Sequence, residues 1–467
     1  MMKKAFSKKN LWEKTPLLLK GTIGKGLSIF PLDWLLGRKF KCNYKFLKES
    51  QYWPIEKLRQ YQIDKLREIL SLAYQKTRLY HLLFESVGFH PDDFKSLEDL
   101  QKLPTIDKQT VINNISNMCT LTPEKSNVDY VSTGGTSGTP LHFYINADRS
   151  SIEYAYLTKS WQRAGYELGM PMAVLRGRIV KPDKNGLYHE YDPILRHHYY
   201  STFHMTNENL SRYLDHIRSI GPCVLQAYPS SADSFASFIL KTKKTEINNI
   251  KAVLLESENV YPDQVCNIEK AFGARAFSCY GHSEKLILAT QCEKSDNYHV
   301  WPTYGYFELL DKQGKAIKEP GQEGEIVGTG FINTVMPFIR YRTGDYAIYA
   351  GDYCKECNRQ HVLINNIKGR WPQGGLVAMD GSTISMTALN VHDDTLNNIR
   401  EYQFYQSVPG KATLFVVPMF PLYQNEKDRI LRNINKRLQG QVILELEVKS
   451  ELLKTSRGKQ PRVFKTF

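Results

Sequence analysis

Residues 132–140 have the composition expected of a phosphate-binding loop. Glycines and hydroxyl residues fill every position except the final proline, and an apolar stretch ending at Tyr130-Val131 precedes them. The backbone N–H groups and hydroxyls of such a loop can surround phosphate oxygens, and glycine permits a close approach of the backbone. No Gly-Lys-Ser/Thr follows, which excludes a Walker loop. On its own, a loop of this kind is more often a surface turn. The candidate phosphate ligands are Ser132, Thr133, Gly134, Gly135, Thr136, Ser137, Gly138 and Thr139.

Four further motifs follow this loop along the chain. Glu284, at the end of Tyr280-Gly281-His282-Ser283-Glu284, can hold a Mg²⁺ ion that bridges phosphates. Asp345 ends the motif Tyr341-Arg342-Thr343-Gly344-Asp345, where a carboxylate can accept both hydroxyls of a ribose. Gly369-Arg370 comes next, and Gly458-Lys459 lies near the C-terminus. Each motif alone has an ordinary explanation, such as a turn or a solvated lysine, but their order and spacing together indicate nucleotide chemistry.

Alternating strands and helices are expected to position these motifs. Helical patterns cover residues 54–80, 150–163, 230–240 and 262–272, and strands are expected at 172–175, 221–228, 252–255 and 274–280. This alternation predicts an α/β fold with largely parallel sheets. From 301 to 349, strands separated by glycine turns predict an antiparallel subdomain. A smaller unit follows, with strands at 411–417 and 441–448, a helix at 425–438 and Gly440 in the C-capping position.

The chain is too long for one compact core, so several domains are expected. We predict a basic N-terminal arm at 1–49, a large domain at 50–369, and a small, mobile α+β C-terminal domain at 370–467. The fold class is therefore α/β, with mixed sheets and an antiparallel subdomain in the large domain.

The positive charge is concentrated at the N-terminus. Of the net charge of +14, residues 1–50 contribute twelve Lys/Arg against three Asp/Glu, or +9, which leaves +5 for the other 417 residues. A nucleic-acid partner is therefore not expected. Lys20, Lys25, Pro31 and Asp33 interrupt the apolar residues, so neither a membrane span nor a signal peptide is expected. Residues 1–45 are either an arm packed on the body or a peripheral contact with an anionic membrane surface.

The eight cysteines and the lack of a secretory signal favour a reducing compartment, so a cytoplasmic location is expected, with the inner face of the membrane as an option. Cys354 and Cys357 form a Cys-x-x-Cys pair, and Cys292 with His299 could complete a tetrahedral structural Zn²⁺ site. The other interpretation is unpaired core thiols beside a chance histidine.

The five motifs resemble those of the adenylate-forming superfamily of acyl-CoA synthetases and adenylation domains. Within it the chain is most similar to the phenylacetate–CoA ligase-like branch, through the helix 66–80 and the stretches 96–100 and 102–108. The stretch from 380 to 404 resembles the CapK-type members found with capsule genes. The resemblance covers roughly residues 50–467.

The resemblance implies a role for each motif, with ATP and Mg²⁺ as cofactors. The loop holds the triphosphate, Glu284 binds Mg²⁺, Asp345 holds the ribose, Arg370 sits at the hinge, and Lys459 reaches the α-phosphate. Glu284, Arg370 and Lys459 are the implied catalytic residues. The other implied ATP ligands are Glu258, Asn259, Val260, Tyr280, Gly281, His282, Ser283 and Arg342, and the implied acyl pocket contains His198, Tyr228 and Pro229.

The expected function is ATP-dependent activation of a carboxylic acid, with transfer of the acyl group to an acceptor. The family's hinge usually continues Gly-Arg-x-Asp, whereas this chain reads Gly369-Arg370-Trp371-Pro372-Gln373. This departure leaves adenylation intact but counts against the rotation that delivers a thiol. It favours an amine or sugar acceptor in surface-polysaccharide assembly over the thiol of CoA. A scaffold that has lost the reaction is the remaining alternative.

Overall fold

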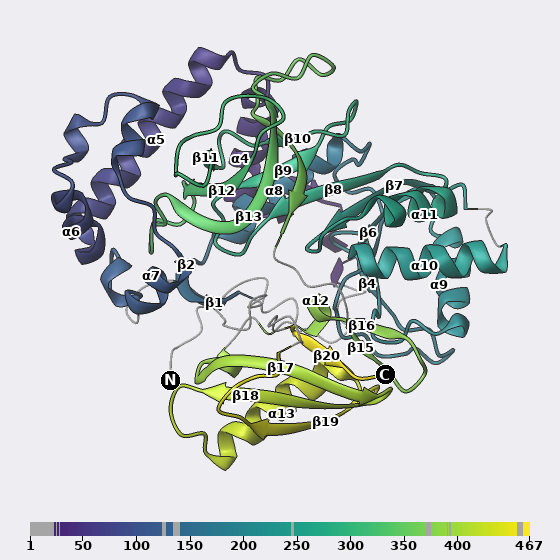
Figure 1. The fold of residues 1–467 in the computed structure, drawn as a ribbon. Helices are drawn as coiled ribbons and strands as arrows, with labels where there is room; N and C mark the ends of the chain where they lie inside the picture. The colour runs from purple at the N-terminus through teal and green to yellow at the C-terminus, as the bar shows by residue number, and fades with distance from the viewer. Residues whose placement is uncertain are drawn as a thin grey trace.

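A single twelve-stranded mixed sheet forms the centre of the molecule (Figure 1). The computed structural model describes residues 23–24, 26–27, 29–123, 128–133, 141–243, 247–369, 375–389, 391, 394–454 and 461–467. The strand order is β11-β12-β13-β14-β10-β9-β8-β7-β6-β3-β5-β4. The parallel strands are β3 (Met172–Leu175), β5 (His197–Tyr200), β6 (Cys223–Ala227), β7 (Ile250–Glu256) and β8 (Ala276–Gly281).

The antiparallel strands continue this sheet and do not form a sheet of their own. Beyond β8 they are β9 (Leu288–Gln291), β10 (Tyr298–Val300), β14 (Leu363–Lys368), β13 (Tyr341–Gly351), β12 (Glu323–Gly330) and β11 (Gly305–Leu310). At the opposite edge, β4 (His189–Asp192) is antiparallel to β5. The antiparallel subdomain expected at 301–349 is therefore one half of the central sheet.

Helices cover both faces of the parallel half. Ala173 and Leu175 of β3 belong to the core beneath α9 (Asn207–Ser219), α10 (Pro229–Thr242) and α11 (Pro262–Phe272). Met172 and Val174, which alternate with them, pack on the other face with Trp161 of α8 (Arg149–Gln162). This period of two along a strand buried on both faces explains why the strand reads as a continuous apolar run.

The N-terminal helices pack on the outside of this body. α4 (Gly37–Ser50) lies against α8 and buries Phe40 and Leu47 completely, so this part of the predicted arm is packed on the protein. The single helix expected at 54–80 is two helices, α5 (Ile55–Lys76) and α6 (Arg78–Ser86). Thr77 separates them because its hydroxyl accepts from the Tyr80 N–H and caps α6. None of the described helices is long and apolar enough to cross a membrane.

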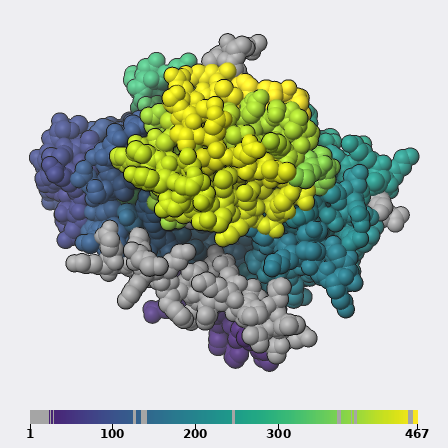
Figure 2. Space-filling model, turned by 90° about the horizontal axis from the view of Figure 1, so that it is seen from below, coloured from purple at the N-terminus to yellow at the C-terminus, as the bar shows by residue number. Residues whose placement is uncertain are grey.

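The C-terminal unit lies against one side of the body (Figures 1 and 2). Its sheet has the order β19-β18-β17-β20, formed by β17 (Ile399–Val408), β18 (Lys411–Pro418), β19 (Ile443–Val448) and β20 (Val463–Lys465), with α13 (Gln424–Leu438). α13 ends in two left-handed residues, Gln439 (φ 51°) at the C-cap and the expected Gly440 (φ 74°) directly after it. β15 (Gly375–Val377), β16 (Thr383–Ser385) and α12 (Met386–Leu389) pack in one core with this unit and with Phe203 and Tyr228 of the body.

Candidate nucleotide site

A cleft of about 510 Å³ opens at the carboxyl ends of the parallel strands. Residues that directly follow β3, β7 and β8 line it, together with the C-terminal end of β1 (Val128–Ser132) and residues of β13. Ligands of α/β sheets bind at this edge because the strand-to-helix loops converge there. The cleft therefore brings the start of the loop, the Glu284 motif and Asp345 together at one edge of the sheet.

The cleft gathers most of the predicted ligands that the structure describes. Those that line it are Ser132, Thr133, Tyr228, Glu258, Asn259, Tyr280, Gly281, His282, Ser283, Glu284 and Asp345. Gly134 to Thr139, Arg370 and Lys459 lie outside the described residues. Val260, Arg342, His198 and Pro229 do not line the cleft.

The phosphate-loop candidate is held at its base by a two-stranded ribbon. β1 pairs antiparallel with β2 (His142–Asn146), from Val128 opposite Asn146 to Ser132 opposite His142. Beyond that pair, the Thr133 N–H donates to the Leu141 carbonyl at 2.8 Å, and the Thr133 hydroxyl accepts from the Leu141 N–H at 3.1 Å. Thr133 and Leu141, the described residues on either side of the loop, are thus held next to each other at the cleft.

Tyr280 connects the Glu284 motif to Asp345. Its hydroxyl donates to Asp345 Oδ2 at 2.9 Å, although the two residues lie on different strands. Burial, with the Asp345 carboxylate as a smaller cause, raises the pKa of Tyr280 well above its usual value, so the phenol stays protonated and remains a donor. This hydrogen bond fixes the direction of a carboxylate that faces the cleft.

Glu284 is 5% exposed and comes from a tightly constrained turn. His282 Nδ1 lies 3.5 Å from its Oε2. The next residue, Lys285, has a positive φ of 59° and forms an ion pair with Glu153 of α8. A Cβ at Gly305 would lie 1.9 Å from the Leu286 carbonyl oxygen, so this turn can cross β11 only over a glycine.

An ionic network that no sequence motif predicts lies on the floor of the cleft, where Arg176 is partly exposed and Glu256 is buried. Arg176, directly after β3, donates to Glu256 Oε2 at 2.8 Å and to the Ser257 hydroxyl at 2.8 Å. Glu256 also accepts from the Trp161 indole at 3.0 Å and from the Gln226 amide at 3.1 Å. Ser257 has a positive φ of 70°, a strained conformation that concentrates at functional sites. The only signal in the sequence is Arg176 itself, a charged residue that directly follows the apolar strand β3.

The segment that carries Glu258 and Asn259 connects the body to the predicted hinge. The Asn259 amide donates to the Gly369 carbonyl and accepts from the Gly369 N–H, both at 3.1 Å. The Glu258 carboxylate accepts from the Ser230 N–H at 3.0 Å, in the first turn of α10, where a negative charge is favourable. These contacts hold the cleft wall immediately before the predicted hinge residue.

The predicted ligands outside the cleft have other partners. The Arg342 guanidinium forms an ion pair with Glu325 of the neighbouring strand β12. His198 lies beside His189 and His216 at the sheet edge. Pro229 begins α10, where its ring occupies a position that needs no N–H donor.

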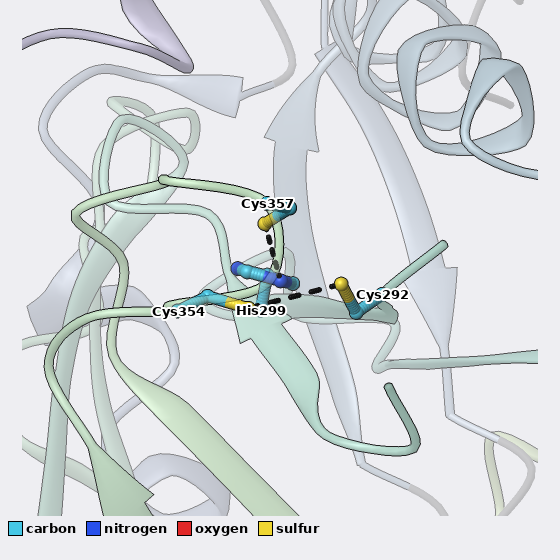
Figure 3. A group of neighbouring side chains, drawn as sticks. All are labelled: Cys292, His299, Cys354 and Cys357. Atoms are coloured by element: carbon cyan, nitrogen blue, oxygen red, sulfur yellow. Dashed lines mark hydrogen bonds between the residues drawn. The ribbon is translucent and has the colours of Figure 1, made fainter. Parts of the chain in front are cut away.

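The predicted zinc ligands converge as a separate centre (Figure 3). The ligand atoms of Cys292, His299, Cys354 and Cys357 all lie within 4.8 Å of one another. Cys292 Sγ is 3.9 Å from Cys354 Sγ, and Cys357 Sγ is 3.4 Å from His299 Nε2. Tetrahedral Zn²⁺, with bonds of about 2.3 Å to sulfur and about 2.0 Å to nitrogen, requires edges of about 3.8 and 3.5 Å. Burial lowers the pKa of His299 to about 2, so its ring is neutral and can act as a ligand.

Comparisons with known proteins agree on one fold. No protein-family profile matches the chain. It is 26% identical to the protein CapK of Staphylococcus aureus over 81% of this chain and 84% of that protein. It is also 26% identical to a phenylacetate–coenzyme A ligase of Pseudomonas putida, over 62% of this chain and 66% of that enzyme. Among solved structures, 2-hydroxyisobutyryl-CoA ligase in its postadenylation state aligns with a TM-score of 0.57 at 18% identity, covering 89% of this chain and 91% of that one.

Proposed function

Because the chain is a member of the adenylate-forming ligase superfamily, in its phenylacetate–CoA ligase-like branch, we propose that it activates a carboxylic acid with ATP. In this reaction the acid attacks the α-phosphate, pyrophosphate leaves, and an acceptor then displaces AMP from the acyl-adenylate. The observation that carries the proposal is the cleft itself. One cavity is lined by Ser132 and Thr133 at the start of the phosphate loop. Glu284, Asp345 and Gly369, the residue before the predicted hinge, line the same cavity.

Each of these residues would supply one part of the first step. Ser132 and Thr133 begin the loop that holds the triphosphate, and Glu284 would hold the Mg²⁺ that offsets its charge. Asp345, oriented by Tyr280, would accept the ribose hydroxyls. The acid and the α-phosphate are both anionic, so catalysis depends mainly on charge neutralisation and alignment, which we assign to Lys459. Residues after Gly369 would act as the lid that brings Lys459 to the cleft.

We propose that the acceptor is an amine or a sugar in surface-polysaccharide assembly. The CapK relative matches 81% of this chain, whereas the Pseudomonas putida ligase matches 62%. The sequence Trp371-Pro372 after Arg370, which replaces the usual acidic residue, points the same way. Coenzyme A is the second candidate acceptor, since several relatives are phenylacetate–coenzyme A ligases. The Cys292 cluster would hold a structural Zn²⁺ ion that ties β9 and β10 to the loop before β14.

The test is ATP–pyrophosphate exchange by the full chain across a panel of uronic, amino and aromatic acids. At least one acid should support exchange. Lys459→Ala should lower its rate about 10²–10³-fold, while Lys454→Ala, the change of an exposed lysine paired with Glu451, should not alter it. Equal exchange by Lys459→Ala and the native chain, or no exchange with any acid, would refute the proposal. AMP release with that acid is then compared with amines, sugars or CoA as acceptor, and a response to CoA alone would replace the favoured acceptor.

A further inference from the structure

Three histidines from three different elements meet at the outer edge of the large sheet. His189 lies on β4, His198 on β5 and His216 on α9, and one ring nitrogen of each lies within 4.8 Å of the others. His189 Nε2 is 3.1 Å from His198 Nδ1. None of the three lines the nucleotide cleft. The cluster is therefore separate from the proposed ligase chemistry.

The fold brings these rings together through strand register. β4 and β5 are antiparallel, with His189 opposite Tyr200 and Tyr191 opposite His198. Side chains two positions apart share a face, so His189 and His198 are diagonal neighbours on one face of the hairpin. α9 covers that face: Tyr213 packs on Tyr200 with ring centroids 5.1 Å apart. His216, one helical turn later, packs on His189 with centroids 4.3 Å apart.

We propose that His189, His198 and His216 form a tris-imidazole site for a divalent transition-metal ion such as Zn²⁺. Three histidine ligands with bonds of about 2.0–2.1 Å require nitrogens about 3.4 Å apart, and the fourth position is left for water. The separation of 3.1 Å between His189 and His198 is already close to that value. All three residues are partly exposed, so an ion can reach them from solvent.

The surroundings of the cluster are those of a metal site. His216 Nδ1 lies 2.6 Å from the Tyr200 oxygen. In the tautomer that donates the Nδ1–H to this oxygen, the hydrogen bond fixes the ring and leaves the Nε2 lone pair for the ion.

The consequence of binding would be structural. The ion would tie the edge hairpin β4–β5 to α9 by bonds that the sheet alone does not supply. β5 also pairs with β3, and β3 runs directly into Arg176 on the floor of the cleft. Occupancy of the site would therefore stiffen the side of the sheet that supports the cleft wall.

The experiment is a count of bound metal in the full chain, stripped with a chelator and reloaded with Zn²⁺. His189→Gln and His198→Gln should each bind one equivalent less than the native chain. His81→Gln, the change of an exposed histidine on α6, should bind the same number as the native chain. Tyr200→Phe keeps the ring and should weaken binding at this site about 10–100-fold.

Cobalt separates this site from the cysteine centre. When Co²⁺ replaces Zn²⁺, the native spectrum minus that of His198→Gln should contain visible d–d bands without thiolate-to-metal charge transfer, because no sulfur is a ligand here. A thiolate band in that difference would refute the assignment. Equal metal content in the native chain and both glutamine variants would show a hydrogen-bonded histidine cluster that holds no ion. Unchanged affinity in Tyr200→Phe would remove the role given to that hydroxyl.

Discussion

Replacing Asp345 tests whether its carboxylate binds a nucleotide ribose. The side chain lines the cleft, and Tyr280 fixes its direction through a hydrogen bond of 2.9 Å. Hydrogen bonds to a charged group contribute about 1.5–3 kcal/mol each. Asp345→Asn removes the charge and one acceptor, so the loss corresponds to about one such bond. Because 1.4 kcal/mol is a factor of ten, AMP and ATP should bind about 10- to 150-fold more weakly.

Calorimetric titration of AMP measures this loss without knowledge of the acid. Asp352→Asn is the matched control, because Asp352 accepts from the Tyr349 hydroxyl at 2.6 Å just after the same strand, outside the cleft. Its AMP affinity should stay within about twofold of the native value. Titrations with 2′-deoxy-AMP and 3′-deoxy-AMP, each of which lacks one ribose hydroxyl, complete a double-mutant cycle between the carboxylate and that hydroxyl. The native chain should discriminate against them, and Asp345→Asn should discriminate less. If Asp345→Asn binds AMP as the native chain does, or keeps the full penalty for the missing hydroxyl, the carboxylate does not hold the ribose.

Three further predictions concern other parts of the molecule. The buried Gln403 amide donates to the Leu453 and Pro461 carbonyls at 3.0 and 2.7 Å, on either side of the segment with Lys459. Gln403→Leu should therefore slow pyrophosphate exchange by up to about 100-fold while AMP affinity in titrations is unchanged; equal exchange rates would contradict this. Cys292→Ser should remove one equivalent of zinc and lower the thermal midpoint, whereas exposed Cys266→Ser should do neither. Burial lowers the pKa of His142 to about 4, so protonation of the unfolded chain should reduce stability as pH falls from about 6.5 to 4, by at most about 3 kcal/mol. Thermal melts of His142→Phe should lose less over that range than melts of the native chain.

Structure is predicted best from the sequence where one short motif contains both the signal for a helix or strand and the functional group. Helix α11 has the predicted bounds, 262–272, because a proline stands at its start and Gly273 adopts φ 61° at its end. The strand at 172–175 is also as predicted, because an uninterrupted apolar run fits a strand buried on both faces. Glu284 follows the end of β8 as expected, whereas Asp345, expected on a turn, lies within β13; both line the cleft.

The sequence predicts poorly where a residue's partner is distant along the chain. Arg176 and Glu256 are 80 residues apart, and only the parallel pairing of β3, β6 and β7 brings them together. The same reason explains the sheet itself: a pattern of strands and turns from 301 to 349 cannot tell whether β9 pairs with β8. That single antiparallel pairing, of Cys279 with Thr290 and its neighbours, joins the two halves into one sheet.

His198 shows a different kind of limit, which is the choice of face. His197 and His198 are adjacent on β5, so their side chains point to opposite sides of the sheet. The family resemblance implies that His198 belongs to the acyl pocket, but the sequence pattern does not say which side of the strand α9 covers. A shift of one residue exchanges the two faces and every partner with them. The covered side is decided by Tyr213 and His216, whose spacing on α9 matches the spacing of Tyr200 and His198 on the strand. The position of His198 outside the cleft and the tris-histidine cluster therefore have the same cause, the packing of a helix against an edge hairpin.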